Sequence, residues 1–553
     1  MKRFTLFAAM ALAMSMTANA QTWEDNLTTV DNADDYVRST PMAVDASGNT
    51  VVTGRYSLQD NLQFGLYTFT GVTANDAFIA KYDAKGAKQW VAGINGNAVF
   101  TALDTDAEGN IYAAGIFAAE AQVCGTSGEP QTITDGDATN TSRYSSFIVK
   151  YDKDGVVKSV KTLVPAADYS VVTSDEAFPF FEPVTTIAKI QADGDKVYFS
   201  LSYRGTVTID DLTLDGRYVD AIYVVSDVNS AAIVSVNASD LGSASTVAFL
   251  GAQDKVMSSV SYQSEGVNFT VDNGVVYAGF IGQGTLGLTT AAGTEPITLS
   301  YGDDGSNEHG FIFAKIDGNS TVVKTYNTTP TSAWNLLNEI DQMVVSDGKL
   351  LVAGTFNIKG LFGGLEYKGG CDMFVASLNT SDLSLVAAKA SNLEEGDANN
   401  NAEVVTALFF YDNAWYLTGY SETTSDDAFV APLIYTIDPA TCQFTDKTVN
   451  LYVTAAAENN GTVVCQYGDD GKTYRFVSGL QPITGINEVA DNGQTIERKG
   501  DEITASAATD FAVYAADGAL VKAAKASTGI SLAGLGKGVY VVKAGQKTVK
   551  VSK

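Results

Sequence analysis

The sequence predicts an all-β protein, in which a β-propeller of four-stranded blades is followed by a small immunoglobulin-like β-sandwich. Three observations lead to this fold class. The 553 residues include 51 glycines, 26 tyrosines and 26 phenylalanines but only 10 prolines, which suits many short strands joined by tight turns. A unit of two hairpins recurs along most of the chain, and the composition changes near residue 485.

The first twenty residues have the features of a secretory signal peptide. Lys2-Arg3 is followed by an apolar stretch over residues 4–16, and Ala18-Asn19-Ala20 forms a small-residue cleavage site. The apolar stretch is shorter than the roughly 20 residues that cross a bilayer, and no later segment is long and apolar enough to do so. We therefore expect residues 1–20 to be removed, the mature chain to begin at Gln21, and the protein to be exported rather than membrane-spanning.

The first half of the repeated unit is an apolar strand, a turn of the form Asp-x-x-Gly-Asn, and a second strand that ends in glycine. It is clearest at residues 42–54 and 102–115. Weaker copies occupy residues 187–200, 269–279, 343–354 and 408–419, and the copy that begins at Ile187 lacks the final glycine. Successive copies begin about 60 to 85 residues apart, more than the roughly 40 to 50 of compact propeller repeats, so insertions are expected.

The second half of the unit is an apolar strand followed by a turn with Asp and Gly. Residues 77–86 set the pattern and lead to a strand containing Trp90; residues 146–155, 310–318 and 372–378 follow it. Two hairpins make a four-stranded blade, and stacking blades around an axis covers the faces that one blade leaves exposed. The units resemble the seven-bladed propeller repeats of bacterial secreted proteins, a likeness that implies this architecture but no particular function.

The last unit has one strand too few. Residues 451–457, 462–467 and 473–478 supply three strands, and the segment around Trp23 precedes residue 42 much as Trp90 precedes residue 102. We predict that the N-terminal strand completes the last blade and closes the ring. This arrangement gives seven blades, with six or eight as alternatives, in a propeller over residues 21–483.

Residues 484–553 form a separate domain in this interpretation, because the strongly acidic chain acquires a slight basic excess there. Residues 511–521 read as a hairpin with an Asp-Gly turn, and further strands follow. The segment resembles the C-terminal sorting domain of the type IX secretion system of Bacteroidetes, with matches at Tyr514, Gly518, Val521, Leu535, Gly538, Tyr540, Val542, Lys547 and Lys550. The resemblance implies an Ig-like sandwich, contact with the secretion machinery, and delivery to the cell surface or the medium. An ordinary stabilising β-sandwich is the alternative.

Charge and cysteine content exclude several classes of protein. A net charge of −29 argues against a nucleic-acid partner, because phosphate binding needs clustered Lys and Arg. Cys124, Cys371, Cys442 and Cys465 are too few for a disulfide scaffold in a chain of this length. One pair, Cys442 with Cys465, is the preferred bridge because both fall in adjacent predicted strands, and four free thiols are the alternative.

Catalytic constellations are scarce, and we assign no catalytic, cofactor-binding or metal-binding residue. The single histidine, His309, falls in a polar loop, where an exposed turn residue is the expected role. The spacings of a zinc site with His and Cys ligands do not occur. Two facing carboxylates would suffice for a glycosidase, but the sequence singles out no pair. Residues 468–474 partly resemble the Asp-box turn of sialidases, which is a structural element.

Two further features concern possible binding. The turns that begin at Asp45, Asp106 and Asp152 gather several oxygens as calcium requires, although they lack the final Glu of an EF-hand and such residues also build plain hairpin turns. Long polar insertions occupy residues 118–145, 163–183, 207–227 and 285–307. In repeat rings such insertions gather on one face, where they carry binding or are merely tolerated.

Together these features favour an exported, non-enzymatic binding or scaffold propeller that recognises a glycan, a peptide or a host protein through loops on one face. A carboxylate-based glycoside hydrolase or lyase on the same fold is the first alternative. A structural surface or adhesion protein is the second.

Overall fold

The computed structural model describes most of the chain, and it divides into two compact units, residues 1–480 and residues 481–553. The described residues are 22–25, 41–56, 61–64, 67–70, 76–135, 145–166, 185–203, 205–219, 225–227, 230–252, 263–300, 308–331, 338–368, 370–391, 401–423, 430–446, 453–459, 461–467, 474–478, 496–499, 501–515, 520–536, 539–544 and 547–552. The chain is all-β over these residues. They include no helix long and apolar enough to span a membrane. The proposed signal peptide, residues 1–20, lies outside them.

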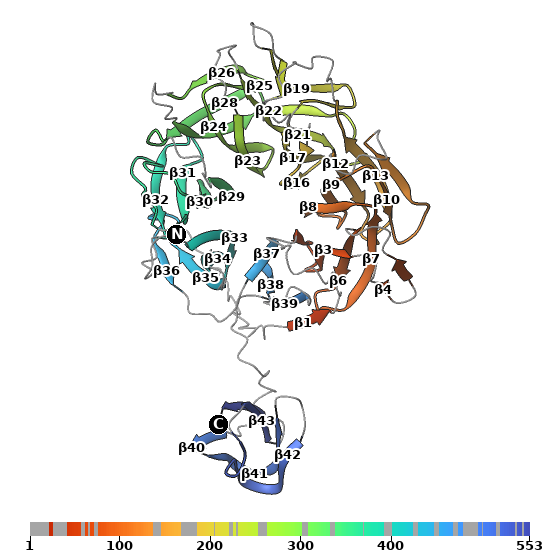
Figure 1. Cartoon of the computed structure of the whole chain (residues 1–553), viewed down its shortest axis with the longest axis vertical. Coiled ribbons are helices and arrows are strands. Elements are labelled where there is room, and N and C mark those ends of the chain that lie inside the picture. The colour runs from red at the N-terminus through yellow and green to blue at the C-terminus, as the bar shows by residue number, and fades with distance from the viewer. Residues whose placement is uncertain are drawn as a thin grey trace, which may run out of the picture. The chain divides into compact units, whose positions relative to one another are not determined.

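Unit 1 is a β-propeller, in which antiparallel sheets stand side by side around a ring (Figure 1). Each sheet is named here as a blade after its innermost strand. The first three are the β2 blade with β2 (Met42–Val44), β3 (Thr50–Tyr56), β6 (Asp76–Tyr82) and β7 (Lys88–Asn95); the β8 blade with β8 (Ala98–Thr105), β9 (Ile111–Phe117), β12 (Ser145–Tyr151) and β13 (Val157–Leu163); and the β16 blade with β16 (Ile190–Asp193), β17 (Lys196–Tyr203), β21 (Ser230–Asn237) and β22 (Ser245–Ala252).

The remaining blades follow the same order. They are the β23 blade with β23 (Gln263–Asp272), β24 (Val275–Gln283), β27 (His309–Asp317) and β28 (Ser320–Asn327); the β29 blade with β29 (Glu339–Ser346), β30 (Lys349–Phe356), β31 (Asp372–Asn379) and β32 (Leu385–Ala390); the β33 blade with β33 (Asn401–Tyr411), β34 (Ala414–Thr423), β35 (Val430–Ile437) and β36 (Phe444–Asp446); and the β37 blade with β37 (Val453–Asn459), β38 (Thr462–Tyr467), β39 (Tyr474–Ser478) and β1 (Thr22–Asp25). The predicted hairpins are the inner and outer hairpins of these blades.

Smaller strands lie in the connections between blade strands. They are β4 (Asn61–Phe64), β5 (Tyr67–Thr70), β10 (Glu120–Cys124), β11 (Gln131–Thr134), β14 (Pro165–Ala166), β15 (Thr185–Thr186), β18 (Gly205–Ile209), β19 (Leu212–Val219), β20 (Val225–Asp227), β25 (Thr285–Thr290) and β26 (Gly293–Thr298).

The N-terminal strand pairs with the last strand of the ring, as the sequence predicted. Trp23 of β1 lies opposite Phe476 of β39, in antiparallel register. Each inner strand contacts the next around the ring, and β37 contacts β2. The Nδ2 of Asn459 donates a hydrogen bond of 2.8 Å to the carbonyl oxygen of Val44, which joins the end of the propeller sequence to its beginning.

In three copies of the repeat, the glycine that ends the first half permits a β-bulge. Opposite Gly115, Gly354 and Gly419, the inner strand carries one extra residue. A Cβ atom on any of these glycines would collide with a main-chain carbonyl oxygen of that inner strand. The β16 blade has Leu201 instead of glycine, and its inner edge consists of two short strands, β15 and β16. The missing glycine in that copy therefore marks a local change of structure.

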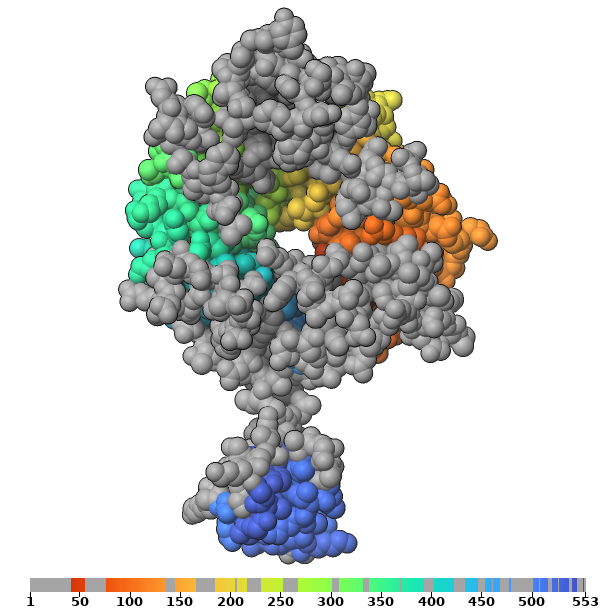
Figure 2. Space-filling view, in the orientation of Figure 1, coloured from red at the N-terminus to blue at the C-terminus, as the bar shows by residue number. Residues whose placement is uncertain are grey.

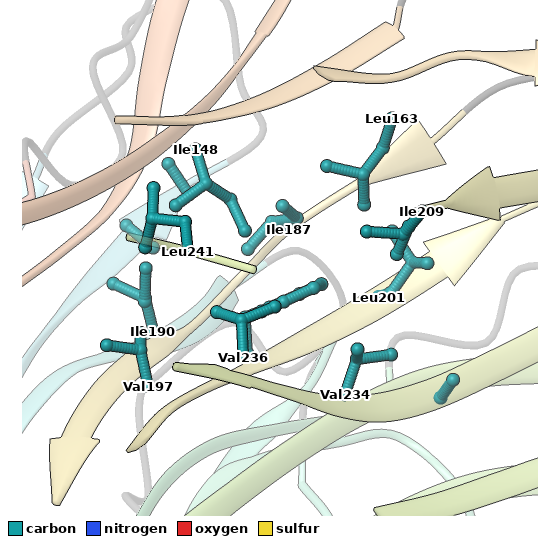
Figure 3. Packing of buried hydrophobic residues seen from close by; sticks show 14 of the residues in the cluster. Ile148, Leu163, Ile187, Ile190, Val197, Leu201, Ile209, Val234, Val236 and Leu241 are labelled. Carbon is teal, nitrogen blue, oxygen red and sulfur yellow. The ribbon is translucent and has the colours of Figure 1, made fainter. Parts of the chain in front are cut away.

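A hydrophobic cluster fills the space between each pair of neighbouring blades. In Figure 3, Ile148 and Leu163 of the β8 blade pack toward Val197, Leu201 and other apolar residues of the β16 blade. Because both faces of a blade are covered, its third strand is buried almost throughout, as β6 and β31 are. This double burial explains why the second half of the repeat is continuously apolar rather than alternating.

Unit 2 is a sheet built around one long hairpin. Its strands are β40 (Ile496–Lys499), β41 (Glu502–Ala515), β42 (Leu520–Ser531), β43 (Val539–Ala544) and β44 (Lys547–Ser552), in the order β40-β41-β43-β44 with β42 also on β41. Tyr514 lies opposite Leu520, so the predicted hairpin is confirmed; residues 516–519 of its turn lie outside the described residues. Ile503, Phe511 and Val542 are among the residues of the unit's own buried core.

Candidate functional site at the two ends of the ring

The two ends of the ring differ in the length of their connections. Within a blade, the strands are counted outward from the centre and alternate in direction. The connection from the first strand to the second and the connection from the third to the fourth therefore lie at the same end of the ring, which we call the turn end. None of these exceeds seven residues, the length of segment 238–244. The second-to-third connections begin and end at the opposite, loop end, and include residues 118–144, 204–229 and 284–308. The predicted insertions therefore start from one end of the ring. Figure 2 shows the opening at the centre of the ring.

At the turn end, aspartate carboxylates fold the turns. Asp45 Oδ1 accepts hydrogen bonds of 2.9 Å from the N–H groups of Ser47 and Asn49, and Asp45 Oδ2 accepts one of 2.8 Å from Asn49 Nδ2. Asp106 and Asp152 accept main-chain hydrogen bonds in the same way. These bonds account for the Asp-x-x-Gly-Asn pattern as turn chemistry. The described residues hold no group of three or more His, Cys, Asp or Glu placed to bind a metal.

One of these turns contains a buried ion pair. Lys81 of β6 places its Nζ 2.9 Å from Asp45 Oδ2, and the two side chains are only 6% and 3% exposed. Burial by itself would raise the pKa of Asp45, but the hydrogen bonds from Asn49 and Lys81 hold that pKa below its usual value. The lysine of the repeat's second half thus secures the turn of its first half.

At the loop end, the third strand of several blades begins with a buried polar residue. Asp76, Ser145, Ser230 and Asp372 occupy this position. Asp76 Oδ1 accepts a hydrogen bond of 2.7 Å from Gly96 N, and Asp372 Oδ2 accepts one of 2.9 Å from Lys368 N. Burial raises the pKa of Asp372 to about 6. Asp45 and Asp372 therefore have opposite pKa shifts.

His309 occupies the equivalent position, and the prediction of an exposed turn residue was wrong. The side chain is 3% exposed, and His309 lies opposite Gln283 as the first residue of β27. Its N–H donates to Thr328 Oγ1 at 3.0 Å. The strand begins one residue earlier than the polar sequence before it suggests, because the neighbouring strand extends to Gln283.

Two carboxyl groups meet at the bulge of β29, where Glu339 hydrogen-bonds to Asp341. Burial, together with the charge of Glu339, raises the pKa of Asp341 well above its usual value. Thr355 Oγ1 donates to Asp341 Oδ2 at 3.4 Å and to the carbonyl oxygen of Glu403 at 3.3 Å. The Glu403 carboxylate accepts a hydrogen bond of 3.2 Å from Met373 N. The sequence analysis did not predict these three acidic residues as a group. Acidic residues within otherwise apolar inner strands could have indicated them.

A second charged pair links the β8 and β16 blades. Lys189 lies near Asp104, and its Nζ is 5.8 Å from the ring centroid of Phe269. Burial lowers the pKa of Lys189 to about 8 and raises that of Asp104 to about 6. Asp104 Oδ2 accepts a hydrogen bond of 2.8 Å from Ala192 N, which ties the two blades together. No pattern in the sequence indicated this pair.

All four cysteines are free thiols, so the preferred Cys442–Cys465 bridge was wrong. Cys442 packs between the β29 and β33 blades, whereas Cys465 packs between the β33 and β37 blades. The two thiols therefore face different clusters on either side of one blade. Burial raises the pKa of Cys371 and of Cys442 to about 12, which disfavours the reactive thiolate.

The partial Asp-box falls mainly outside the described residues. Residues 468–473 are not described, and Tyr474 is the first residue of β39.

No protein-family model matches the chain, and no curated protein matches it either. Solved structures give weak similarities. The β-propeller domain of the trilobed protease from Pyrococcus furiosus is 10% identical with a TM-score of 0.38, over 83% of this chain and 99% of that one. The extracellular domain of a putative one-component system from B. thetaiotaomicron is 9% identical with a TM-score of 0.14, over 96% and 98%. A quinohemoprotein alcohol dehydrogenase from Pseudomonas putida HK5 is 9% identical with a TM-score of 0.30, over 85% and 78%.

Proposed function

We propose that this chain is an exported, non-enzymatic binding or scaffold protein whose propeller recognises a glycan, a peptide or a host protein at its loop end. The observation that supports it best is the difference between the two ends, with long connections at one and tight, internally bonded turns at the other. Long surface connections on a rigid ring tolerate changes of sequence, which is how recognition surfaces are commonly built.

The binding test uses the full mature chain on a glycan array and on immobilised host matrix proteins. One variant replaces residues 301–307 by a short turn, because Ser300 and Glu308 on either side of them are already joined by a main-chain hydrogen bond of 3.0 Å. The control is Lys153→Met, at an exposed ion pair of the turn end. We expect the loop-end variant to lose binding while its melting temperature changes little, and the control to bind normally. Turnover of a polysaccharide, or loss of binding only in the turn-end variant, would overturn the proposal.

A carboxylate-based hydrolase or lyase is the alternative, because Glu339, Asp341 and Glu403 lie close together. Loss of a measured polysaccharide turnover in Asp341→Asn would favour this alternative.

We also propose that the ring has seven blades, one for each inner strand, and that β1 closes it. Support comes from the β1–β39 pairing and from the contact of β37 with β2. Deleting residues 21–30 would expose the edge of β39, so the whole propeller should melt at a lower temperature. A truncated protein that melts like the parent would contradict this closure.

For the remaining segments we propose a signal peptide at residues 1–20, a propeller over residues 21–483 and a sorting domain over residues 484–553, with delivery to the cell surface or the medium. The separate core of unit 2 supports its independence. Removing residues 485–553 should leave the propeller folded but retain it in the periplasm of the native host. Fractionation together with a thermal melt tests both parts, since normal delivery would contradict the sorting role and loss of a cooperative melt would contradict independence.

A further inference from the structure

Several blades cover the outer strand of the blade before them. The second-to-third connection of the β8 blade supplies β10, which pairs with β7 through Val123 opposite Ile94. The corresponding connection of the β23 blade supplies β25, which pairs with β22. In the β29 blade, the carbonyl oxygen of Lys359 accepts a hydrogen bond of 2.8 Å from Thr329 N, just beyond β28. Added strands or main-chain contacts thus protect outer edges that would otherwise attract foreign strands.

The outer strand β32 carries no added strand, and among the described residues β13, β28 and β36 carry none either. The next blade has a short second-to-third connection, because β34 and β35 pair up to Glu422 opposite Val430 and only residues 424–429 link them. Within the described part of the chain, β31 is the single strand that pairs with β32. Val386 of β32 is 38% exposed, the most of any described large aliphatic residue in unit 1.

A groove of about 420 Å³ runs beside this strand. Its walls are the turn Phe362–Glu366 on one side and Leu385 and Ala388 on the other, with Glu366 and Lys389 also lining it. The turn is fixed in place: Leu365 N donates to the carbonyl oxygen of Leu361 at 2.8 Å, and Phe362 packs among aromatic rings that include Phe374. The groove is therefore formed before any ligand arrives.

We propose that β32 and this groove bind an extended segment of a partner polypeptide, which adds to the blade as a further strand. The same chain already fills equivalent edges in this way, with β10 on β7 and β25 on β22. Alternate small apolar side chains of the partner would enter the groove, and its flanking charges would pair with Lys389 and Glu366. A second copy of this chain is a poorer occupant, because two molecules of net charge −29 repel each other.

The test selects peptides of twelve residues from a random displayed library on the full mature chain, and measures the affinity of synthetic copies by fluorescence polarisation. Ala388→Phe fills the groove, and Lys389→Glu reverses one lining charge. Lys324→Glu makes the same charge change on β28, the outer strand of the preceding blade, as a matched control. We expect peptides with alternating apolar residues whose affinity falls at least tenfold in the first two variants and stays unchanged in the control.

Hydrogen exchange distinguishes strand addition from other binding. Bound peptide should protect main-chain amides of β32, and sedimentation should show one copy of the chain. The proposal is overturned if no peptide is enriched, if Lys389→Glu binds the selected peptides as well as the parent, if β32 gains no protection, or if the chain dimerises in a way that Lys389→Glu abolishes. Lys389→Glu keeps the test decisive if Ala388→Phe fails to fold.

Discussion

Aspartates at the two ends of the ring show how one residue type can serve different purposes. At the turn end, Asp45 receives hydrogen bonds from its own turn and from Lys81, and its pKa is lowered. At the loop end, Asp372 and Asp341 are buried with fewer compensating donors, and their pKa values are raised. Asp45 therefore uses its charge to stabilise the fold, whereas Asp372 and Asp341 keep theirs at a cost in stability, as the buried Asp104 beside a turn also does. Such a cost is typical of regions that selection retains for another reason.

The largest effect should come from the buried ion pair of the turn end. Lys81→Met leaves the Asp45 carboxylate buried without its cation, which typically costs about 3 kcal/mol of unfolding free energy. Chemical denaturation measures the loss. The matched control is Lys153→Met, which breaks an exposed pair whose side chains are 63% and 70% accessible and should change stability little. Equal effects of the two substitutions would contradict the assigned role of the buried pair.

A smaller loss is expected when the turn itself is disturbed. Asp106→Ala removes the acceptor of the Glu108 and Asn110 N–H groups and should cost about 1 to 2 kcal/mol. Asp106→Asn keeps an acceptor oxygen and should cost less. Urea denaturation of both variants separates the hydrogen bonds from the charge, and a larger loss for Asn than for Ala would refute the turn role.

Removing the buried charge of Asp372 at the loop end should stabilise the protein rather than destabilise it. The pKa of Asp372 rises from 3.8 to about 6 on folding, so between about pH 4 and 6 the folded chain binds more protons than the unfolded chain. The stability that this group contributes therefore falls as pH rises through that window. Asp372→Asn, which can still accept from Lys368 N, should melt higher than the parent at pH 7, with the difference shrinking toward pH 4. A lower melting temperature at pH 7 would contradict this sign.

The sequence was sufficient for elements whose signal is local or repeated. Asp45-x-x-Gly48-Asn49 predicted its hairpin because the turn is bonded within itself. The missing last strand predicted that the strand around Trp23 completes the last blade, where Trp23 lies opposite Phe476. The addition of β10 to β7 was not predictable, since it depends on contacts between neighbouring units. The carboxyl pair of Glu339 and Asp341 was not predicted for a related reason, because a bulge places the two side chains together.

The smallest effect is expected in an insertion of the loop end. Thr289 and Thr294 share a hydroxyl hydrogen bond of 3.0 Å on the exposed face of the hairpin β25–β26. Thr289→Val should change the unfolding free energy by less than about 0.5 kcal/mol, because the freed hydroxyl is hydrated and valine suits a strand as well as threonine does.

The substitution Thr406→Val inside a blade is the matched comparison for Thr289→Val. Thr406 is buried, shares a hydroxyl hydrogen bond of 2.9 Å with Thr418, and donates one of 3.0 Å to the carbonyl oxygen of Val453 in the next blade. Thr406→Val should therefore cost about 1 to 3 kcal/mol, because it leaves a buried acceptor without its partner. If Thr289→Val proved as costly, the loop-end insertions would belong to the stabilising framework, and the functional difference between the two ends would lose its basis.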